Sequence, residues 1–552
     1  AAYSTSLLLA AAGVLPGLTL LPQTTRGALS FSEAATWSLH PWRLLELVWP
    51  FALGNPLDAS RNLAELVANS GAGELSPSWS LSLYLGAPIL ALALLSALRK
   101  ERRAMLAGAV FLTFLAVGAY SPLYSFFRGV FPPERVIRYP EKHIAGAICI
   151  LCALAGAGIS QVRTSQRTAR WLFVGTAASL AIPLAALALL RPWLLHKLGA
   201  DAALLSPPLE LPLILEGSLR SGALSLAVAA AVSCLLLRSN GAGIALYLAH
   251  AIWAAWDITP LGSPERFARV PQLLRGTARE PTGPPRRLLR SSLADAELLP
   301  ETMHDAWHET LYLDSPCRFG FAAVPGFEGW RSTEFASLWR RAGGMPVQTF
   351  ATLFAIDFVA LPAGQRTLGS LFELEAGAAE DSPDGKVAWT LIRNKGVRPR
   401  AFVAPRWRWT SPGTAVDALL DPLRARDPDL VVLSGAGTSG TSAERLTPCQ
   451  ITHYSPERVS MLCDSPSGGY AVLADEYAAG WTAAVDEEPA AISRADVLLR
   501  AVRVGPGAHR VDFVYRTPLL RTGIFISICS WVGWGALLLR TRRSTLTPAP
   551  AG

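Results

Sequence analysis

Six charged or imidazole side chains fall within thirteen residues in the stretch FPPERVIRYPEKH, residues 131–143, between two apolar runs. Arg135 and Arg138 lie three residues apart, Lys142 follows four residues later, and Tyr139 stands between Arg138 and Lys142. A guanidinium group binds phosphate through two parallel hydrogen bonds. Three prolines stiffen the stretch and so reduce the entropy lost on binding a ligand. The residues therefore predict a site for a phosphate at the head of a lipid.

Three residues of this stretch, Tyr139, Glu141 and His143, could orient these cations or a second bound molecule. A competing interpretation is a structural loop whose charges pair among themselves or bind ordinary phospholipid.

A second stretch with polar groups is WSLHPWRLLELVWPFALG, residues 37–54, which contains three Trp residues around a short apolar helix. Aromatic side chains with polar edges settle at the level of lipid headgroups, so the stretch is typical of an interfacial helix. The functional alternative is a groove for a lipid-linked substrate, with His40, Arg43 and Glu46 facing it.

His250 and Asp257 lie seven residues apart near the end of an apolar run, so both could share one helix face. Ionisable groups within membrane spans are expensive and often functional, which makes Asp257 a candidate catalytic residue. Solvation at the membrane surface is the alternative explanation for Asp257.

Common catalytic and metal-binding motifs are absent from the sequence, including HExxH, GxSxG, the P-loop and the EF-hand. The cofactor stays unassigned, and no motif supports a divalent metal. The stretch GAGTSG, residues 435–440, matches GxGxxG, but Pro448 follows too soon for a nucleotide-binding helix, and we interpret it as a turn. Cys449 and Cys463 lie 14 residues apart and could form a disulfide.

The composition indicates a chain partly embedded in lipid. Of 552 residues, 51% are hydrophobic and 17% charged, and the mean hydropathy is +0.30. The net charge of +8 comes from Arg residues beside apolar runs, which membrane topology explains better than nucleic-acid binding. The expected partner is therefore the lipid bilayer, and we expect no nucleic acid.

Eight apolar runs are long enough, some marginally, for membrane spans of about 20 residues. They are residues 4–21, 81–98, 105–120, 143–160, 171–190, 223–237, 242–256 and 523–539. Basic residues follow the second, fourth, sixth and last runs, so these connections are expected to face the cytoplasm. The intervening loops and the large segment 258–521 are then expected outside.

The polar segment ends in a series of predicted strands: ITHYS, RVSMLC, YAVLAD, WTAAVD, VLLRAVRV and HRVDFVY. A β-sandwich is the natural packing for such a series. Before it, WRSTEFASLWRRAGG is typical of a helix and FATLFAIDFVALP of a buried strand, while REPTGPPRR, residues 279–287, is interpreted as a linker.

The predicted fold class is a polytopic α-helical membrane protein with an extracytoplasmic mixed α/β region that ends in a β-sandwich. The expected segments are a transmembrane domain of about seven spans at 1–257 with outside loops 22–80, 121–142 and 191–222, a linker at 258–297, a mixed α/β region at 298–448, a β-sandwich part at 449–520, a last transmembrane helix at 521–540 and a cytoplasmic tail at 541–552.

Three stretches together resemble the YfhO-like bacterial membrane proteins, a family related in fold to the GT-C class of glycosyltransferases that use polyprenyl-phosphate sugars. They are WSLHPWRLLELVWPFALGNP with SLYLGAPILALALL, the VIRYPEKH loop, and YAVLADEYAAGWTAAVDEEPAAISRADVLLRAVRVGPGAHRVDFVYRTP. The last carries a GW, a VD, a single Arg before an apolar strand and a GxH turn. The likeness extends over most of residues 37–518.

The resemblance implies a GT-C-like, inverting glycosyltransferase that moves a sugar from a polyprenyl-phosphate donor to a cell-surface glycan or polymer acceptor, outside the bacterial inner membrane. It implies that Arg135, Arg138 and Lys142 hold the donor phosphate and that Trp481 and Tyr477 contact the acceptor. In such enzymes an acidic residue soon after the first span serves as base or metal ligand. Glu33 is the only acid in the segment that follows the first run here.

The chain begins with Ala1, so we also expect that it could be a fragment whose catalytic base lies upstream. The alternative function is a non-enzymatic transporter, flippase or scaffold for surface-polymer assembly, which would use the same loop without chemistry.

Overall fold

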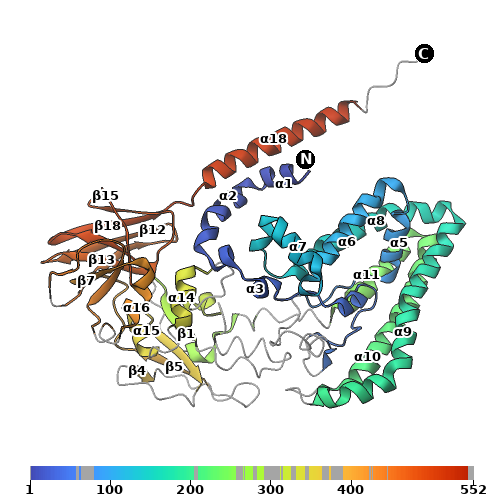
Figure 1. Cartoon of the computed structure of the whole chain (residues 1–552), viewed down its shortest axis with the longest axis horizontal. Coiled ribbons are helices and arrows are strands. Elements are labelled where there is room, and N and C mark those ends of the chain that lie inside the picture. The colour runs from blue at the N-terminus through green and yellow to red at the C-terminus, as the bar shows by residue number, and fades with distance from the viewer. Residues whose placement is uncertain are drawn as a thin grey trace. The chain divides into compact units, whose positions relative to one another are not determined.

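The computed structural model describes residues 2–56, 61–63, 80–203, 209–256, 268–275, 283–290, 315–324, 331–341, 347–362, 372–374, 389–421, 427–443 and 445–544, with single residues 265, 277, 311 and 424. The chain forms two compact units (Figure 1). Among the described residues, the helical unit comprises those at 29–268, and the sheet unit comprises those at 1–28 and from 269 onward.

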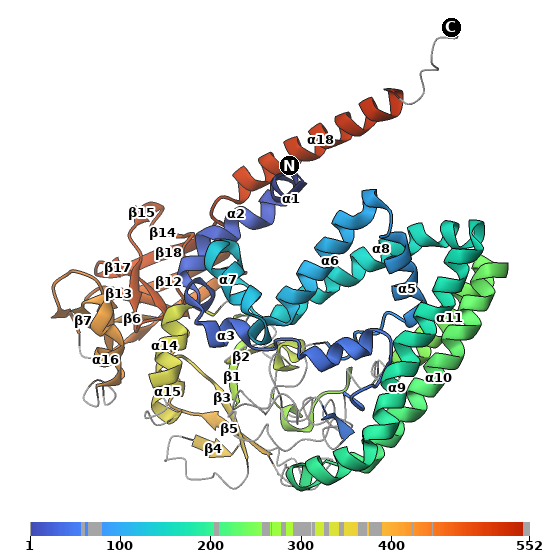
Figure 2. The same ribbon diagram turned by 45° about the vertical axis from the view of Figure 1, so that its right-hand side comes forward.

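Long apolar helices make up most of the helical unit. Their bounds are α5 (Ala87–Ser96), α6 (Arg103–Ala116), α7 (Pro122–Val130), α8 (His143–Thr164), α9 (Gln166–Ala203), α10 (Leu211–Arg238) and α11 (Asn240–Trp256), with a short helix α3 (Phe31–Ala35) before them. Helix α10 runs beside α9 and α11, and α8 packs on α5 and α6 (Figure 2). Small and branched side chains such as Ala93, Ala147 and Leu154 fill the contacts between helices.

Four helical segments in the described part of the chain are long and apolar enough to cross a membrane. They are Pro140–Ile159, Gln166–Gly199, Leu211–Arg238 and Leu520–Leu537. Their outward faces carry large exposed apolar side chains, among them Ile182, Leu189 and Phe525. Apolar surface of this kind is stable in contact with lipid.

The other four expected runs form shorter helices. The run 81–98 becomes helical only at Ala87, because Gly86 adopts a φ of +93° and Pro88 occupies the first turn. The run 4–21 divides at Ala10 into α1 (Ala2–Leu9) and α2 (Ala11–Leu20). The segment 191–222, expected as an outside loop, is largely helical, because α9 continues to Ala203 and α10 begins at Leu211.

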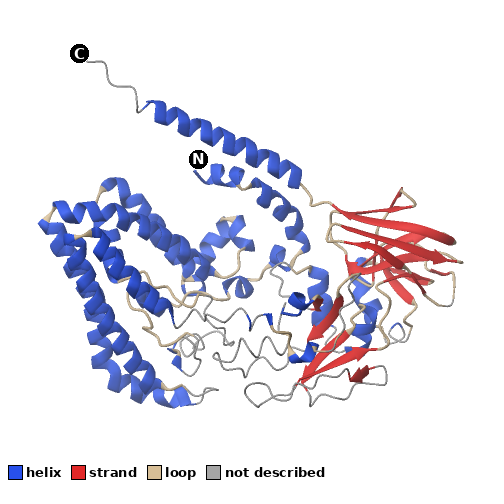
Figure 3. Cartoon of the chain, turned by 180° about the vertical axis from the view of Figure 1, so that it is seen from behind, coloured by secondary structure: helices blue, strands red, loops and turns tan. Residues whose placement is uncertain are grey.

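Three sheets build the sheet unit (Figure 3). The first contains β1 (Arg286–Arg290), β2 (Phe321–Val324), β3 (Phe358–Pro362), β4 (Phe372–Leu374) and β5 (Trp389–Asn394) in the order β2-β1-β3-β5-β4. The second contains β6 (Ala401–Ala404), β7 (Arg406–Thr410), β8 (Leu430–Ser434), β9 (Gly440–Thr441), β10 (Thr447–Pro448), β13 (Gly469–Glu476), β16 (Ser493–Ala495) and β17 (Leu499–Val504). The third contains β11 (Gln450–Tyr454), β12 (Arg458–Ser465), β14 (Trp481–Val485), β15 (Glu488–Ala490) and β18 (Gly507–Tyr515).

The second and third sheets share one apolar core, which confirms the expected strand series and its sandwich packing. Val403 and Leu473 of the second sheet belong to the same buried cluster as Met461, Val511 and Phe513 of the third. Alternation of inward apolar and outward polar residues along β12 and β18 sets this arrangement.

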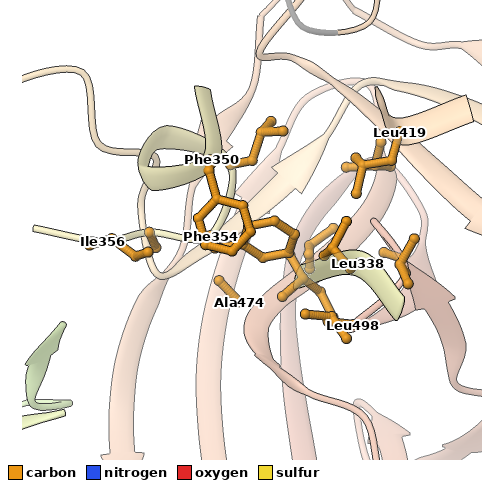
Figure 4. Close-up of a cluster of buried hydrophobic side chains, with 14 of the residues drawn as sticks. Leu338, Phe350, Phe354, Ile356, Leu419, Ala474 and Leu498 are labelled. Atoms are coloured by element: carbon orange, nitrogen blue, oxygen red, sulfur yellow. The ribbon is translucent and has the colours of Figure 1, made fainter. Parts of the chain in front are cut away.

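The other face of the eight-stranded sheet is covered by helices. Figure 4 shows Leu338 of α14 (Thr333–Arg341), Phe350 of α15 (Val347–Leu353) and Leu419 of α16 (Ala415–Leu420) in one cluster with Ala474 and Leu498. A fully buried face on both sides explains why β13 is apolar along nearly its whole length.

Three sequence expectations need correction. FATLFAIDFVALP begins as the end of helix α15 and becomes a strand only at Phe358, because short apolar runs do not distinguish a helix from a strand. The predicted linker 279–287 includes the start of β1, a strand that pairs with both β2 and β3. The sandwich also begins earlier than residue 449, because β6, β7 and β8 belong to its larger sheet.

Helices from the two ends of the sheet unit pack on each other. Helix α2 lies along α18 (Leu520–Ser544), and the Ala12 amide donates a hydrogen bond of 3.0 Å to Ser527 Oγ. A Cβ added at Gly523 would lie 2.5 Å from the carbonyl oxygen of Ala11. The absence of a side chain at Gly523 therefore permits the close approach of these helices.

Candidate functional site

The stretch 131–143 is a rigid loop made of two 3₁₀ turns, Pro132–Val136 and Pro140–Lys142. Tyr139 joins them with a φ of +70°, a left-handed conformation that costs a residue with a Cβ about 1–2 kcal/mol. Contacts with the preceding segment hold it: the Tyr139 amide donates to the Ala34 carbonyl at 3.2 Å, and the ring lies 4.2 Å from that of Trp37. The two polar stretches of the sequence thus meet in one place.

A buried ion-pair network joins these stretches. Arg43 Nη1 lies 2.5 Å from Glu141 Oε1, and Arg43 Nη2 lies 3.0 Å from Glu46 Oε2. Arg43 also donates to the Ser80 carbonyl at 2.8 Å, and the Ser80 hydroxyl bonds to Glu141. Arg43 and Glu141 are only 4% and 1% exposed. These three predicted groove and orienting residues therefore position the loops and do not line an open surface.

Two of the three predicted phosphate ligands lie at the ring of Tyr139. The guanidinium carbon of Arg138 is 5.0 Å from the ring centroid, and Lys142 Nζ is 4.7 Å from it. Such cation–π contacts are worth about 0.5–1 kcal/mol at partly exposed sites and fix the direction of a long side chain. The loop therefore holds two cations close to one aromatic ring.

The third predicted ligand, Arg135, caps the preceding helix. Its Nη2 donates to the Gly129 carbonyl at 2.7 Å and its Nε to the Arg128 carbonyl at 3.3 Å. A cation at the C-terminus of α7 interacts favourably with the helix dipole. The structure thus gives Arg135 a structural role at this loop.

Sequence reasoning did not select Glu134 as a site residue. Its Oε1 lies 2.9 Å from Nε2 of His143, and Glu134 is only 2% exposed. A buried carboxylate next to an imidazole fixes the ring orientation and its tautomer. The pairing could not be anticipated, because it depends on the left-handed turn at Tyr139 that brings residues nine apart together.

The remaining candidates of the helical unit lie in different settings. Glu33 forms a capping box with Ser30 at the start of α3, accepting the Ser30 amide at 2.9 Å. His40 packs edge-on against Tyr120, with ring centroids 4.8 Å apart. His250 is buried and bonds to the Tyr84 hydroxyl at 2.8 Å. Asp257 lies outside the described residues.

The two predicted acceptor-binding aromatics occupy different environments in the sheet unit. The Arg500 guanidinium carbon lies 3.6 Å from the Trp481 ring centroid, so Trp481 packs over a buried cation. Tyr477 lines a cavity of about 700 Å³ together with Trp409, Glu334 and Arg494. Tyr477 is therefore placed to contact a ligand, whereas Trp481 stabilises Arg500.

Arginines surround one buried carboxylate in the sheet unit, a cluster that the sequence did not reveal. Asp475 contacts Arg287 at 2.9 Å, Arg400 at 2.7 Å and Arg500 at 3.3 Å. Burial acts to raise the pKa of Asp475, but Arg400, Arg287 and Arg500 hold it below its usual value. The Asp475 carboxylate therefore stays ionised. It lies on β13 and connects this strand to Arg287 of β1 and Arg500 of β17.

Cys449 and Cys463 form a disulfide between β12 and the segment before β11, with Cα atoms 4.4 Å apart. In the part of the chain that the structure describes, no group of three or more His, Cys, Asp or Glu side chains could hold a metal ion.

One comparison with known proteins gives a match. The family model of the bacterial membrane protein YfhO matches residues 441–527, which include β11 to β18 and the start of α18. No curated protein and no solved structure matches the chain. The resemblance seen in the third sequence stretch is confirmed over these residues, and together with the apolar helices it indicates a membrane protein.

Proposed function

We propose that this protein, which carries a YfhO segment at residues 441–527, is a membrane glycosyltransferase that moves a sugar from a polyprenyl-phosphate donor to a cell-surface glycan or polymer. The observation that carries the proposal is the cation pair of Arg138 and Lys142 on either end of a fixed turn at Tyr139. The proposal includes a GT-C-like fold for the membrane domain.

The reaction requires a base that accepts a proton and cations that stabilise the negative charge on the leaving lipid phosphate. The acceptor hydroxyl loses its proton as its oxygen attacks the anomeric carbon, and the bond from that carbon to the phosphate oxygen breaks with inversion. The lipid phosphate leaves with the bonding electrons, and Arg138 and Lys142 stabilise its added charge. Two fixed cations stabilise this charge most when they are already oriented before it develops.

The base in this proposal is His143. Its Nε2 bonds to Glu134, which leaves Nδ1 as the nitrogen able to accept a proton. The buried Glu134 carboxylate would stabilise the imidazolium that forms. Glu33 and Asp257 remain proposed alternatives from the sequence, but Glu33 is engaged as a helix cap.

The proposed setting is the bacterial inner membrane, with the sheet unit outside and the C-terminus in the cytoplasm. The disulfide between Cys449 and Cys463 supports an oxidising compartment for the sheet unit. Arg540, Arg542 and Arg543, at the end of α18, support a cytoplasmic position for that end.

A second candidate is a non-enzymatic flippase, transporter or scaffold that recognises the same lipid phosphate. It is favoured by the engagement of Glu33 and of every carboxylate in the two polar stretches. Glu46 and Glu141 bind Arg43, Glu134 binds His143, and Glu33 caps a helix. Each of these carboxylates is engaged in a structural contact, and none of them is arranged as a catalytic base is expected to be.

The test uses the full chain purified into lipid nanodiscs with a polyprenyl-phosphate sugar labelled in the sugar. Transfer of label to added cell-surface polymer, lost in His143→Ala and Arg138→Ala, is the expected result. Binding of the donor by the wild type without release of lipid phosphate, with weaker binding in Arg138→Ala, would instead support the non-enzymatic candidate.

A further inference from the structure

We propose that the sheet unit binds an anionic sugar, in a cavity of about 440 Å³ beside β5 that is separate from the loop at Tyr139. Five basic side chains and one acidic side chain are among the described residues that line it. They are Arg286, Arg393, Lys395, Arg398 and Arg400, with Asp357 as the acid.

Three neighbouring segments bring these basic residues together. Arg286 begins β1, Arg393 lies near the end of β5, and the chain between β5 and β6 supplies Lys395. The Asn394 side chain fixes the turn there, because its Nδ2 donates to the Ile356 carbonyl at 3.1 Å and its Oδ1 accepts the Gly396 amide at 3.0 Å. The cations are therefore presented by ordered backbone.

The carboxylates that pair with two of the lining arginines are shared among several guanidinium groups. Arg398 and Arg424 both bind Asp496, at 2.9 and 3.1 Å. Arg400 shares Asp475 with two other arginines.

Two buried carboxylates thus face five arginines in this region. The low-dielectric surroundings of these groups strengthen the resulting positive potential at the cavity.

The size and chemistry of the cavity define the class of ligand. Arginine side chains form two parallel hydrogen bonds with phosphate or carboxylate. Small-molecule sites usually have volumes of about 300–1,000 Å³, so the cavity fits one or two sugar units that carry such a group.

This inference deepens the proposed function by making the acceptor polymer anionic, and it rests on that function only for the ligand's role as acceptor. Binding itself is independent of transfer. Phosphorylated sugars and uronic acids share the required charge, and the experiment separates them.

The experiment measures binding of three probes to the full chain in nanodiscs by calorimetry: glucose 6-phosphate, glucuronic acid and neutral glucose. The test variant is Arg393→Ala with Lys395→Ala, because both side chains are exposed and their removal leaves the buried network intact. The control variant, Arg445→Ala with Arg516→Ala, removes two exposed positive charges that do not line the cavity. Melting temperatures of all variants verify folding.

At least one anionic probe is expected to bind in preference to glucose, and the test variant should weaken that binding at least about tenfold. The control variant should change it less than about twofold. Preference for the phosphate or for the carboxylate identifies the ligand group. Equal binding of glucose, no binding of either anion, or unchanged binding in the test variant would overturn the inference. Arg138→Ala should lower the rate of transfer by about 100-fold and leave this binding unchanged, so failure of one proposal does not remove the other.

Discussion

Arg43 Nη1 lies 2.5 Å from Glu141 Oε1, although 98 residues separate them in the sequence. Because both side chains are buried, removal of either one leaves a charge without its main partner in a medium of low dielectric. The pair thereby couples the fold of the first polar stretch to that of the loop at Tyr139.

Arg43→Ala should destabilise the helical unit by about 3–5 kcal/mol. The measurement is denaturant unfolding of the protein in detergent micelles. Arg220→Ala removes an exposed partner of Glu216 and should cost less than about 1 kcal/mol. Similar losses in the two variants would contradict a buried coupling between Arg43 and Glu141.

Arg138→Ala should lower the rate of sugar transfer by about 100-fold, because a preorganised cation near the departing phosphate is lost. The measurement is release of lipid phosphate in nanodiscs. Arg99→Ala, an exposed Arg elsewhere in the helical unit, is the charge-matched control and should retain the wild-type rate. Retention of turnover in Arg138→Ala would exclude the phosphate-binding role of Arg138.

Replacement of Cys449 and Cys463 by Ala should lower the stability of the sheet unit by about 3 kcal/mol, as expected for a disulfide that closes a loop of about 15 residues. Thermal unfolding followed by circular dichroism measures the change. Cys317→Ala, which removes a free and exposed thiol, is the control. An equal melting temperature for the double variant and the control would argue against a structural disulfide.

Asp512 should make the sheet unit sensitive to acid. Burial acts to raise its pKa, but hydrogen bonds from Arg510, Ser460 and Arg458 lower the pKa to about 2. Since the folded pKa lies below the unfolded value of about 4, this contribution is full above about pH 4 and is lost as the pH falls toward about 2. The difference in thermal unfolding between wild type and Asp512→Asn should be full at pH 6 and should shrink steadily as the pH falls from about 4 toward about 2. A constant difference would show that Asp512 does not titrate in this way.

The distribution of basic loops predicts a cytoplasmic C-terminus and an external segment at residues 279–287. Protease sites placed after Gly552 and within residues 279–287 should be protected and cleaved, respectively, when protease is added to spheroplasts. Cleavage at the first site and protection at the second would reverse the orientation.

Local pattern was sufficient to predict much of the fold. Alternating residues and turn signals located β11, β12, β13, β14, β17 and β18, because each strand has one face in the sandwich core or lies between buried layers. The apolar runs located the long helices but not their ends, since Gly86 and Ala10 interrupt hydrophobic stretches without a change in composition. The end of the helix Val347–Leu353 was taken for part of a strand, because a short apolar run does not distinguish the two.

The candidate site was predictable only in part. The charge spacing of residues 131–143 selected Arg138 and Lys142, which do lie at one aromatic ring. It could not separate them from Arg135, whose side chain is directed by the end of α7. The Glu134–His143 pair depends on the left-handed turn at Tyr139, which the sequence did not predict. The Asp475 cluster depends on contacts between segments far apart in sequence, for which a single sequence carries no signal.

The close approach of α2 to α18 imposes an order on biosynthesis. The Ser527 hydroxyl that receives the Ala12 amide is made only after 515 further residues have been synthesised. Helix α2 therefore emerges from the ribosome long before α18 is synthesised. Until then, the small-residue surface of α2 contacts the translocation machinery or the bilayer instead of α18. Packing of α2 on α18 is thus among the last steps in assembling the sheet unit. A chain that stops before Gly523 leaves the surface of α2 without the helix that packs on it.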